Sequence, residues 1–238
     1  ETTAEGRARV YYRGPGADTW EVRYEGPTAT DLSLHAAGPG ELYFGFNQPL
    51  RAFEPTLLRL GPDGIHRLPA PAERLDDLEF LQVGDYALTR DDEGWACGQH
   101  GALWRLEGGA WSRAPSPFAW APGDPQGQHY CVSIDLLAED DGLMLTSEGR
   151  GARWDGRAWR EIAGPEGREA LFLRNGRGLA FSDDAFLRYT AGGWVHLTSQ
   201  CDAATDDALV RRGLVVDHRG ALGLTRDLVI DLGAASWT

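Results

Sequence analysis

The residue types that could do chemistry in this chain are few and widely scattered. Its six histidines, residues 35, 66, 100, 129, 196 and 218, show neither H-x-H nor H-E-x-x-H spacing, so a zinc site on a helix is not supported. The sequence has no G-x-S-x-G nucleophile elbow, no phosphate-binding P-loop and no dinucleotide-binding fingerprint. It also contains no lysine, which excludes Schiff-base and lysine general-base catalysis.

Adjacent aspartates are the remaining candidates for catalysis or metal binding. Paired carboxylates could hold calcium or act in glycoside chemistry. These pairs, however, lie in turn and loop sequence, where aspartate is common: Asp76 with Asp77, Asp140 with Asp141, and Asp206 with Asp207. We therefore expect no enzyme activity, no metal and no cofactor. A hydrolase or lyase with acidic residues at a central rim is the alternative.

Residues that binding sites favour are concentrated in two irregular segments, 47–56 and 116–131. Aromatic anchors and charged groups that confer specificity are typical of protein interfaces. The predicted partner-binding residues are Arg51, Phe53, Glu54, Phe118, Trp120, Asp124, His129 and Tyr130. The alternative is that the aromatic rings fold back over the ends of the sheets and the charged groups are solvated.

A repeated tryptophan pattern predicts the elements that must position these segments. The stretches LWRLEGGAW, ARWDGRAW and LRYTAGGW each end in tryptophan, with an arginine six residues earlier. Including weaker copies, the pattern recurs at positions 20, 65, 111, 159, 194 and 237, in steps of 45, 46, 48, 35 and 43 residues. This period is that of a four-stranded propeller blade.

The copy around Trp111 shows the strands that we expect in each blade. Four β-patterned runs, A to D, cover residues 85–90, 95–99, 102–107 and 110–115, and turn signals separate them. The tryptophan should pack between adjacent sheets, with its N–H bonded. The arginine should reach a carbonyl or carboxylate at the blade edge, or lie over an indole.

We predict an all-β protein with one β-propeller domain over residues 1–238. The expected ring has six blades with a reduced first blade, because the first copy has room only for strands C and D; five or seven blades are the alternatives. The A–B and C–D connections are short and similar, whereas the B–C and D–A connections include the irregular segments 47–56, 70–84, 116–131 and 199–212. Variable loops on a repeated scaffold favour recognition on that face.

The segment GWACGQHGALWRLEGGAW, residues 94–111, resembles the repeat unit of bacterial BNR-like propellers related to photosystem II assembly factors. It more loosely resembles the tectonin propeller lectins. The resemblance implies a propeller that binds proteins or glycans, and it specifies no substrate.

Charge and cysteine content bear on partner and compartment. A net charge of −13 argues against nucleic acid and anionic membranes and fits a basic protein partner. The three cysteines, Cys97, Cys131 and Cys201, form no disulfide framework or metal motif, so we expect ordinary thiols and a cytoplasmic protein. A secreted or periplasmic location is the alternative if a signal peptide was removed. The predicted function is a non-catalytic protein-binding module, with a carbohydrate-binding lectin as the alternative.

Overall fold

The computed structural model describes a chain built almost entirely of antiparallel strands. The described residues are 8–12, 18–19, 21–27, 30–38, 41–51, 53–61, 63–74, 80–118, 130–165, 172–174, 179–181, 186–191, 193–196, 214–217, 220–224 and 229–231. The chain divides into two compact units: unit 1 contains residues 1–98 and 104–112, and unit 2 contains residues 99–103 and 113–238. That residues 1–238 form one domain stays a prediction.

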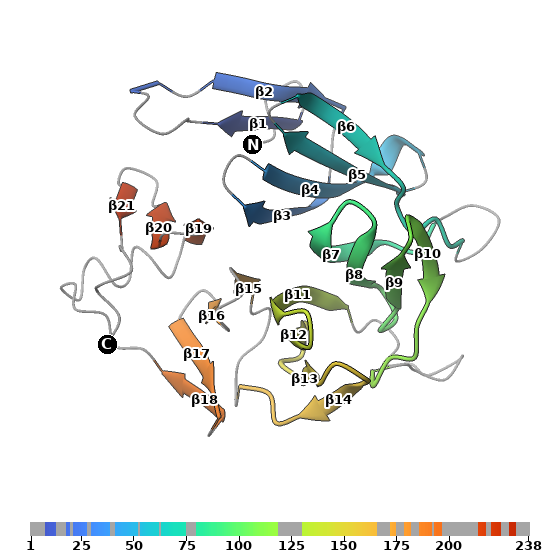
Figure 1. Ribbon diagram of the computed structural model, residues 1–238, viewed down its shortest axis with the longest axis vertical. Coiled ribbons are helices and arrows are strands. Elements are labelled where there is room, and N and C mark those ends of the chain that lie inside the picture. The colour runs from blue at the N-terminus through green and yellow to red at the C-terminus, as the bar shows by residue number, and fades with distance from the viewer. Residues whose placement is uncertain are drawn as a thin grey trace. The chain divides into compact units, whose positions relative to one another are not determined.

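Unit 1 contains three sheets, each made of strands consecutive in the sequence (Figure 1). The first sheet has two strands, β1 (Ala8–Tyr12) and β2 (Glu21–Gly26). The second has four, β3 (Thr30–Gly38), β4 (Glu41–Gln48), β5 (Glu54–Gly61) and β6 (Gly64–Leu68). The third also has four, β7 (Val83–Arg90), β8 (Glu93–Gly98), β9 (Leu103–Glu107) and β10 (Ala110–Arg113). A short 3-10 turn, η1 (Pro49–Arg51), follows β4.

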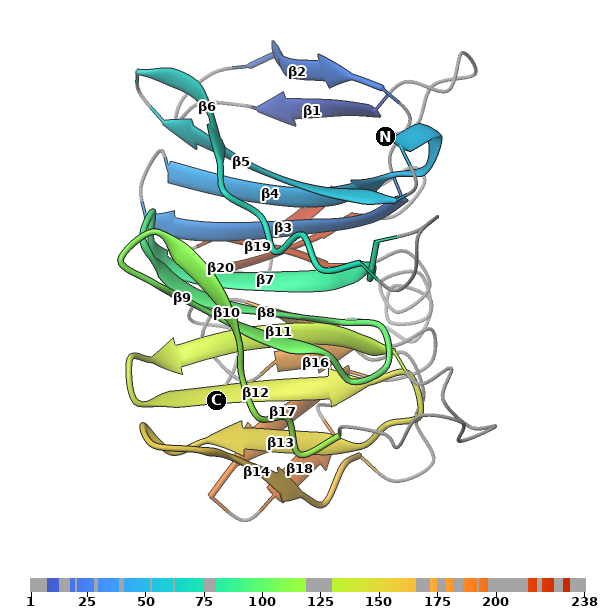
Figure 2. The same ribbon diagram turned by 90° about the vertical axis from the view of Figure 1, so that its right-hand side faces the viewer.

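Unit 2 repeats the arrangement. One sheet contains β11 (Cys131–Ala138), β12 (Asp141–Thr146), β13 (Gly151–Trp154) and β14 (Trp159–Ile162), which lie side by side in Figure 2. The next contains β15 (Phe172–Arg174), β16 (Leu179–Phe181), β17 (Phe186–Thr190) and β18 (Gly193–His196). The last contains β19 (Leu214–Asp217), β20 (Gly220–Leu224) and β21 (Val229–Asp231). The six sheets follow the six sequence copies, and the first copy forms only two strands, as expected. The number of blades in a closed ring stays a prediction.

The first strand of each well-described sheet carries the same two irregularities. The register against the second strand shifts near the beginning and near the end of the first strand: at Thr30/Ser33 and Ala36/Gly38 in β3, at Val83/Asp85 and Leu88/Arg90 in β7, and at Cys131/Ser133 and Leu136/Ala138 in β11. A β-bulge increases local twist and redirects side chains. The repeat therefore extends beyond strand order to the bulges that shape each hairpin.

The repeated tryptophan reaches the neighbouring sheet, as predicted, at Trp111 in unit 1. The expected N–H bond is wrong for Trp194 in unit 2, whose buried indole nitrogen has no hydrogen-bond partner among the residues that the structure describes. The Trp111 indole N–H donates to the carbonyl oxygen of Pro69, which follows β6, at 2.9 Å. Its ring meets Tyr86 edge-on, with ring centroids 6.0 Å apart. Trp20 and Trp237 lie outside the described residues.

The arginines of the repeat bind carboxylates, which confirms the prediction for the three copies whose side chains are described. Arg105 Nη2 lies 2.7 Å from Glu107, and its guanidinium lies 5.4 Å from the centre of the Trp95 ring. Arg153 donates two hydrogen bonds to Asp141, at 2.8 and 3.0 Å. The hydrogen bonds to Asp141 are the main reason that the pKa of Arg153 is raised above its ordinary value.

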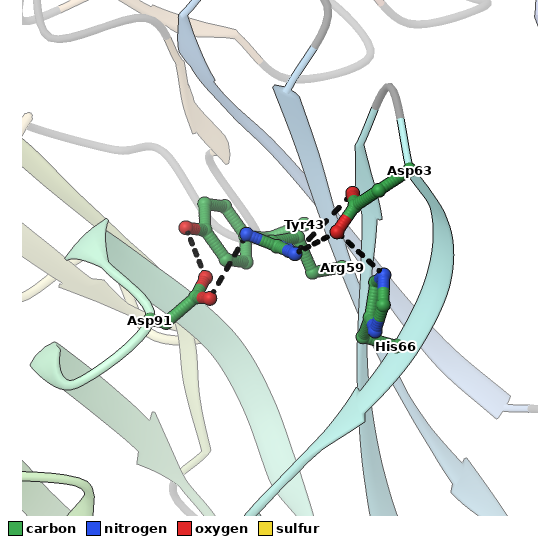
Figure 3. A network of polar contacts seen from close by, with 5 residues as sticks. All are labelled: Tyr43, Arg59, Asp63, His66 and Asp91. Carbon is green, nitrogen blue, oxygen red and sulfur yellow. Dashed lines mark hydrogen bonds and ion pairs between the residues drawn. The ribbon is translucent and has the colours of Figure 1, made fainter.

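Arg59 joins two sheets of unit 1 through the network in Figure 3. Its guanidinium lies 3.0 Å from Asp91 in the β7–β8 turn and 3.1 Å from Asp63 in the β5–β6 turn. The buried Tyr43 hydroxyl donates to Asp91 at 2.8 Å, and His66 Nε2 lies 3.0 Å from Asp63. This network fixes the turns of neighbouring sheets at the end opposite the long loops.

Candidate functional site

The long connections of the repeat lie at one end of each sheet, which we call the loop end; the short hairpins lie at the other end, the turn end. At the loop end of unit 1, Asn47 in β4 exchanges hydrogen bonds with the backbone of Val83 in β7, at 2.8 and 3.2 Å. At the loop end of unit 2, the Ser147 backbone N–H donates to the Tyr130 carbonyl at 2.8 Å. The Tyr130 backbone N–H donates in return to the Ser147 hydroxyl at 3.2 Å. Each unit therefore holds its loop end by specific polar contacts.

In unit 1, the predicted residues Arg51, Phe53 and Glu54 lie together at the β4–β5 connection. Glu54 begins β5 and is approached by two exposed guanidinium groups, from Arg51 at 3.7 Å and Arg67 at 3.4 Å. Phe53 is half-buried, and its backbone N–H donates to the Gln48 carbonyl at 3.0 Å. The loop therefore presents a half-buried aromatic ring beside exposed charged groups.

The β6–β7 connection of unit 1 is more ordered than its irregular sequence indicates. Glu73 accepts a 2.9 Å hydrogen bond from the Trp104 indole, and its carbonyl accepts one from the Leu81 N–H at 2.8 Å. Arg74 pairs with Phe80 as an isolated bridge, and its guanidinium lies 4.5 Å from the centre of the Phe80 ring. Asp76 and Asp77, between these residues, lie outside the described residues.

In unit 2, the predicted residue Phe118 is buried. It follows the alternative given by the sequence, in which an aromatic ring folds back over the end of a sheet. Its side chain is 1% exposed, and the Arg150 guanidinium lies 5.0 Å from the centre of its ring. Arg150 also donates to Glu161 in β14 at 3.0 Å. Tyr130 is half-buried and pairs with Gln99. Because Phe118 is buried, its ring is not an exposed anchor.

The remaining predicted residues, Trp120, Asp124 and His129, lie outside the described residues. Sequence reasoning missed Arg67 and Glu161. The sequence did contain a signal for Arg67: it is the last residue but one of β6, the strand that returns to the loop end. A carboxylate partner for Arg150 could not be found from spacing, because the two residues meet only through the pairing of β13 with β14.

The backbone differs in one respect between the two ends of the sheets. At the β5–β6, β9–β10, β13–β14 and β17–β18 turns, the left-handed positions are all glycine: Gly64, Gly108, Gly109, Gly156 and Gly193. Within the described part of the chain, the two non-glycine residues with positive φ are Phe53 (60°) and His100 (56°). Both belong to second-to-third strand connections, at the loop end. A left-handed non-glycine residue costs about 1–2 kcal/mol, so this strain is confined to one end.

Two further findings concern metals, membranes and cysteines. In the ranges that the structure describes, no group of three or more His, Cys, Asp or Glu side chains could hold a metal ion, and no helix is long and apolar enough to cross a membrane. The expectation of ordinary thiols is wrong for Cys97 and Cys131, which are both disulfide-bonded.

No protein-family model and no curated protein matches the chain. Solved structures do match. The β-propeller domain of Cps50 (Swd1) from Myceliophteria thermophila is 15% identical with a TM-score of 0.50, over 91% of this chain and 75% of that one. The chain is a β-propeller.

Two other structures resemble the propeller at similar identity. A lectin from Aleuria aurantia, in complex with Fucα1-6GlcNAc, is 11% identical with a TM-score of 0.56, over 98% of this chain and 92% of that one. A protein of unknown function from Bacteroides thetaiotaomicron is 12% identical with a TM-score of 0.51 over 84% of this chain. This propeller covers 52% of that chain, about half its length. YCF48 from Cyanidioschyzon merolae also matches, at 11% identity with a TM-score of 0.46, over 75% of this chain and 57% of that one. Identities this low show the fold alone.

Proposed function

We propose that this β-propeller is a non-catalytic module that binds a protein partner through its loop ends. The observation that carries the proposal is that, among the residues that the structure describes, the left-handed non-glycine residues Phe53 and His100 both lie at that end. Glycine would remove the backbone strain at either position. A side chain kept there in spite of the strain is consistent with recognition, because strained residues cluster at functional sites.

The unlike residues at the loop ends favour protein recognition over repeated sugar sites. The left-handed residue is phenylalanine in the β4–β5 loop, histidine with glycine in the β8–β9 loop and glycine in the β12–β13 loop. A lectin with equivalent sites would place similar aromatic platforms in successive blades. Unlike side chains at matching positions fit a partner that contacts each loop differently.

The partner that we propose is basic. The net charge of −13 attracts a positively charged protein over a distance and raises its association rate. Binding should therefore weaken with salt mainly through the association rate. At the loop end of unit 1, the half-buried Glu54 is the acidic group beside Phe53, and an incoming cation would compete there with Arg51 and Arg67.

The test is capture of a partner from the native source by the purified chain and by matched variants. Phe53→Gly and His100→Gly remove a side chain and relieve backbone strain, so both should fold but lose the partner. Asp92→Gly, an exposed residue in the β7–β8 turn, is the control and should retain it. Equal capture by all the variants would show that the loop-end side chains do not bind the partner. Hits on a glycan array without a protein partner would favour the lectin alternative.

A further inference from the structure

The cysteines carry an inference about compartment that goes beyond partner binding. Cys97 lies near the end of β8 and Cys131 begins β11; their side chains are 0% and 1% exposed, and both are disulfide-bonded. The chain has three cysteines, so this leaves Cys201, which is outside the described residues. The structure thus accounts for two buried half-cystines and one further cysteine.

Each half-cystine lies in a tightly built part of its sheet. Cys97 pairs with Asp85 and Cys131 with Thr146, each next to the bulge at the beginning of its sheet's first strand. A Cβ placed on the neighbouring Gly98 would lie 2.1 Å from the Gln82 carbonyl oxygen, so the packing beside Cys97 leaves no space for a side chain at that position.

We propose that the protein folds and works in an oxidising compartment and that Cys97 and Cys131 form part of its permanent structure. Disulfides persist in secreted and periplasmic settings and are kept reduced in the cytosol. Formation removes two electrons and two protons from the thiols. A protein disulfide oxidant accepts them, and its own disulfide becomes two thiols. Complete burial then protects the bond, because attack requires a thiolate to reach one of the sulfur atoms. The proposal differs from the cytoplasmic location expected from the cysteine count and corresponds to the secreted or periplasmic alternative.

The first test labels thiols of the full chain taken directly from its native source. Free thiols are blocked with iodoacetamide under denaturing conditions; the protein is then reduced, treated with N-ethylmaleimide and analysed by mass spectrometry. Cys97 and Cys131 should carry the second label and Cys201 the first. Cys97 and Cys131 carrying the first label would overturn the proposal.

The second test unfolds the protein in denaturant, refolds it with or without dithiothreitol so that the reductant reaches the buried sulfur atoms, and then measures the thermal unfolding midpoint. The reductant should lower the midpoint of the wild type by about 5–15 °C, the shift expected for loss of a native disulfide in a domain of this size. Cys201→Ser should respond like the wild type, whereas Cys97→Ser with Cys131→Ser should not respond. If that double variant does not fold, the wild-type measurement decides. A wild-type midpoint that does not move would overturn the structural role.

Discussion

Replacing Arg59 by methionine should destabilise the propeller by about 2 kcal/mol, through the network that joins two sheets of unit 1. The Arg59 side chain is 18% exposed, and methionine keeps most of its apolar stem while removing the guanidinium. Its contact with Asp91 should contribute about 1–1.5 kcal/mol, because the buried Tyr43 hydroxyl orients the same carboxylate. Its contact with Asp63, which is 59% exposed, should contribute about 0.5 kcal/mol after solvent screening.

Denaturant unfolding with double-mutant cycles can separate these two contacts. The coupling energy of Arg59→Met with Asp91→Asn should be about 1 kcal/mol, and that with Asp63→Asn should be about 0.5 kcal/mol or less. Raising the salt concentration to about 1 M should reduce the coupling to the more exposed Asp63 further. The m-value should stay constant, because a change in m would indicate an altered denatured state or a transition that is not two-state.

Arg105→Met is the matched control, because Arg105 has the same place in the next copy of the repeat. Arg105 and its partner Glu107 are 44% and 60% exposed, so this change should cost about 0.5 kcal/mol. The reasoning would be refuted if Arg59→Met unfolded at the same denaturant concentration as Arg105→Met. A coupling to Asp63 larger than the coupling to Asp91 would also refute it.

Three further predictions concern single positions. Phe53→Gly should leave the unfolding free energy within about 1 kcal/mol of the wild type, because relief of the left-handed backbone offsets the loss of a half-buried ring; a loss above about 3 kcal/mol would show that Phe53 is mainly structural. Gly98→Ala should destabilise by more than about 3 kcal/mol, because its Cβ would meet a backbone carbonyl 2.1 Å away; a neutral effect by chemical denaturation would contradict that packing. The pKa of Asp155 is lowered to about 2, chiefly by its hydrogen bond from Arg160, so an NMR titration should find it there and Arg160→Ala should raise it. Because the folded pKa lies below the unfolded value of about 4, Asp155 stabilises the fold above that pH and the contribution is lost as the pH falls toward 2.

The fold could be predicted because its signals are local and repeated. Glycine and aspartate indicated the positions of the turns, and the spacing of arginine from tryptophan indicated the third and fourth strands of each sheet. The expected run 85–90 is β7 (Val83–Arg90), and the expected run 110–115 is β10 (Ala110–Arg113), so the bounds agree within two residues. The carboxylate partners of the arginines could be expected for the same reason, since the turns that supply them recur.

The site was less predictable because its contacts are tertiary. Phenylalanine is a residue type that interfaces favour, and only the folded structure shows that the Phe118 ring is buried, beside the Arg150 guanidinium. Phenylalanine has no preference for a left-handed backbone, so no local rule could find the conformation of Phe53. The disulfide bonding of Cys97 and Cys131 could not be predicted either, because three widely spaced cysteines form no recognisable framework.

Backbone strain differs between the two ends of the sheets, and its free-energy cost can be compared with the stability of the fold. In the turns that the structure describes, glycine takes the left-handed positions of the turn end at no steric cost. Phe53 and His100 together cost about 2–4 kcal/mol at the loop end, a large share of the roughly 5–15 kcal/mol by which folded proteins are stable. Half-burial of the Phe53 ring contributes about 1 kcal/mol, which offsets only part of the cost of its left-handed backbone. The proposed contacts with a protein partner would account for side chains that glycine could replace with little loss of stability.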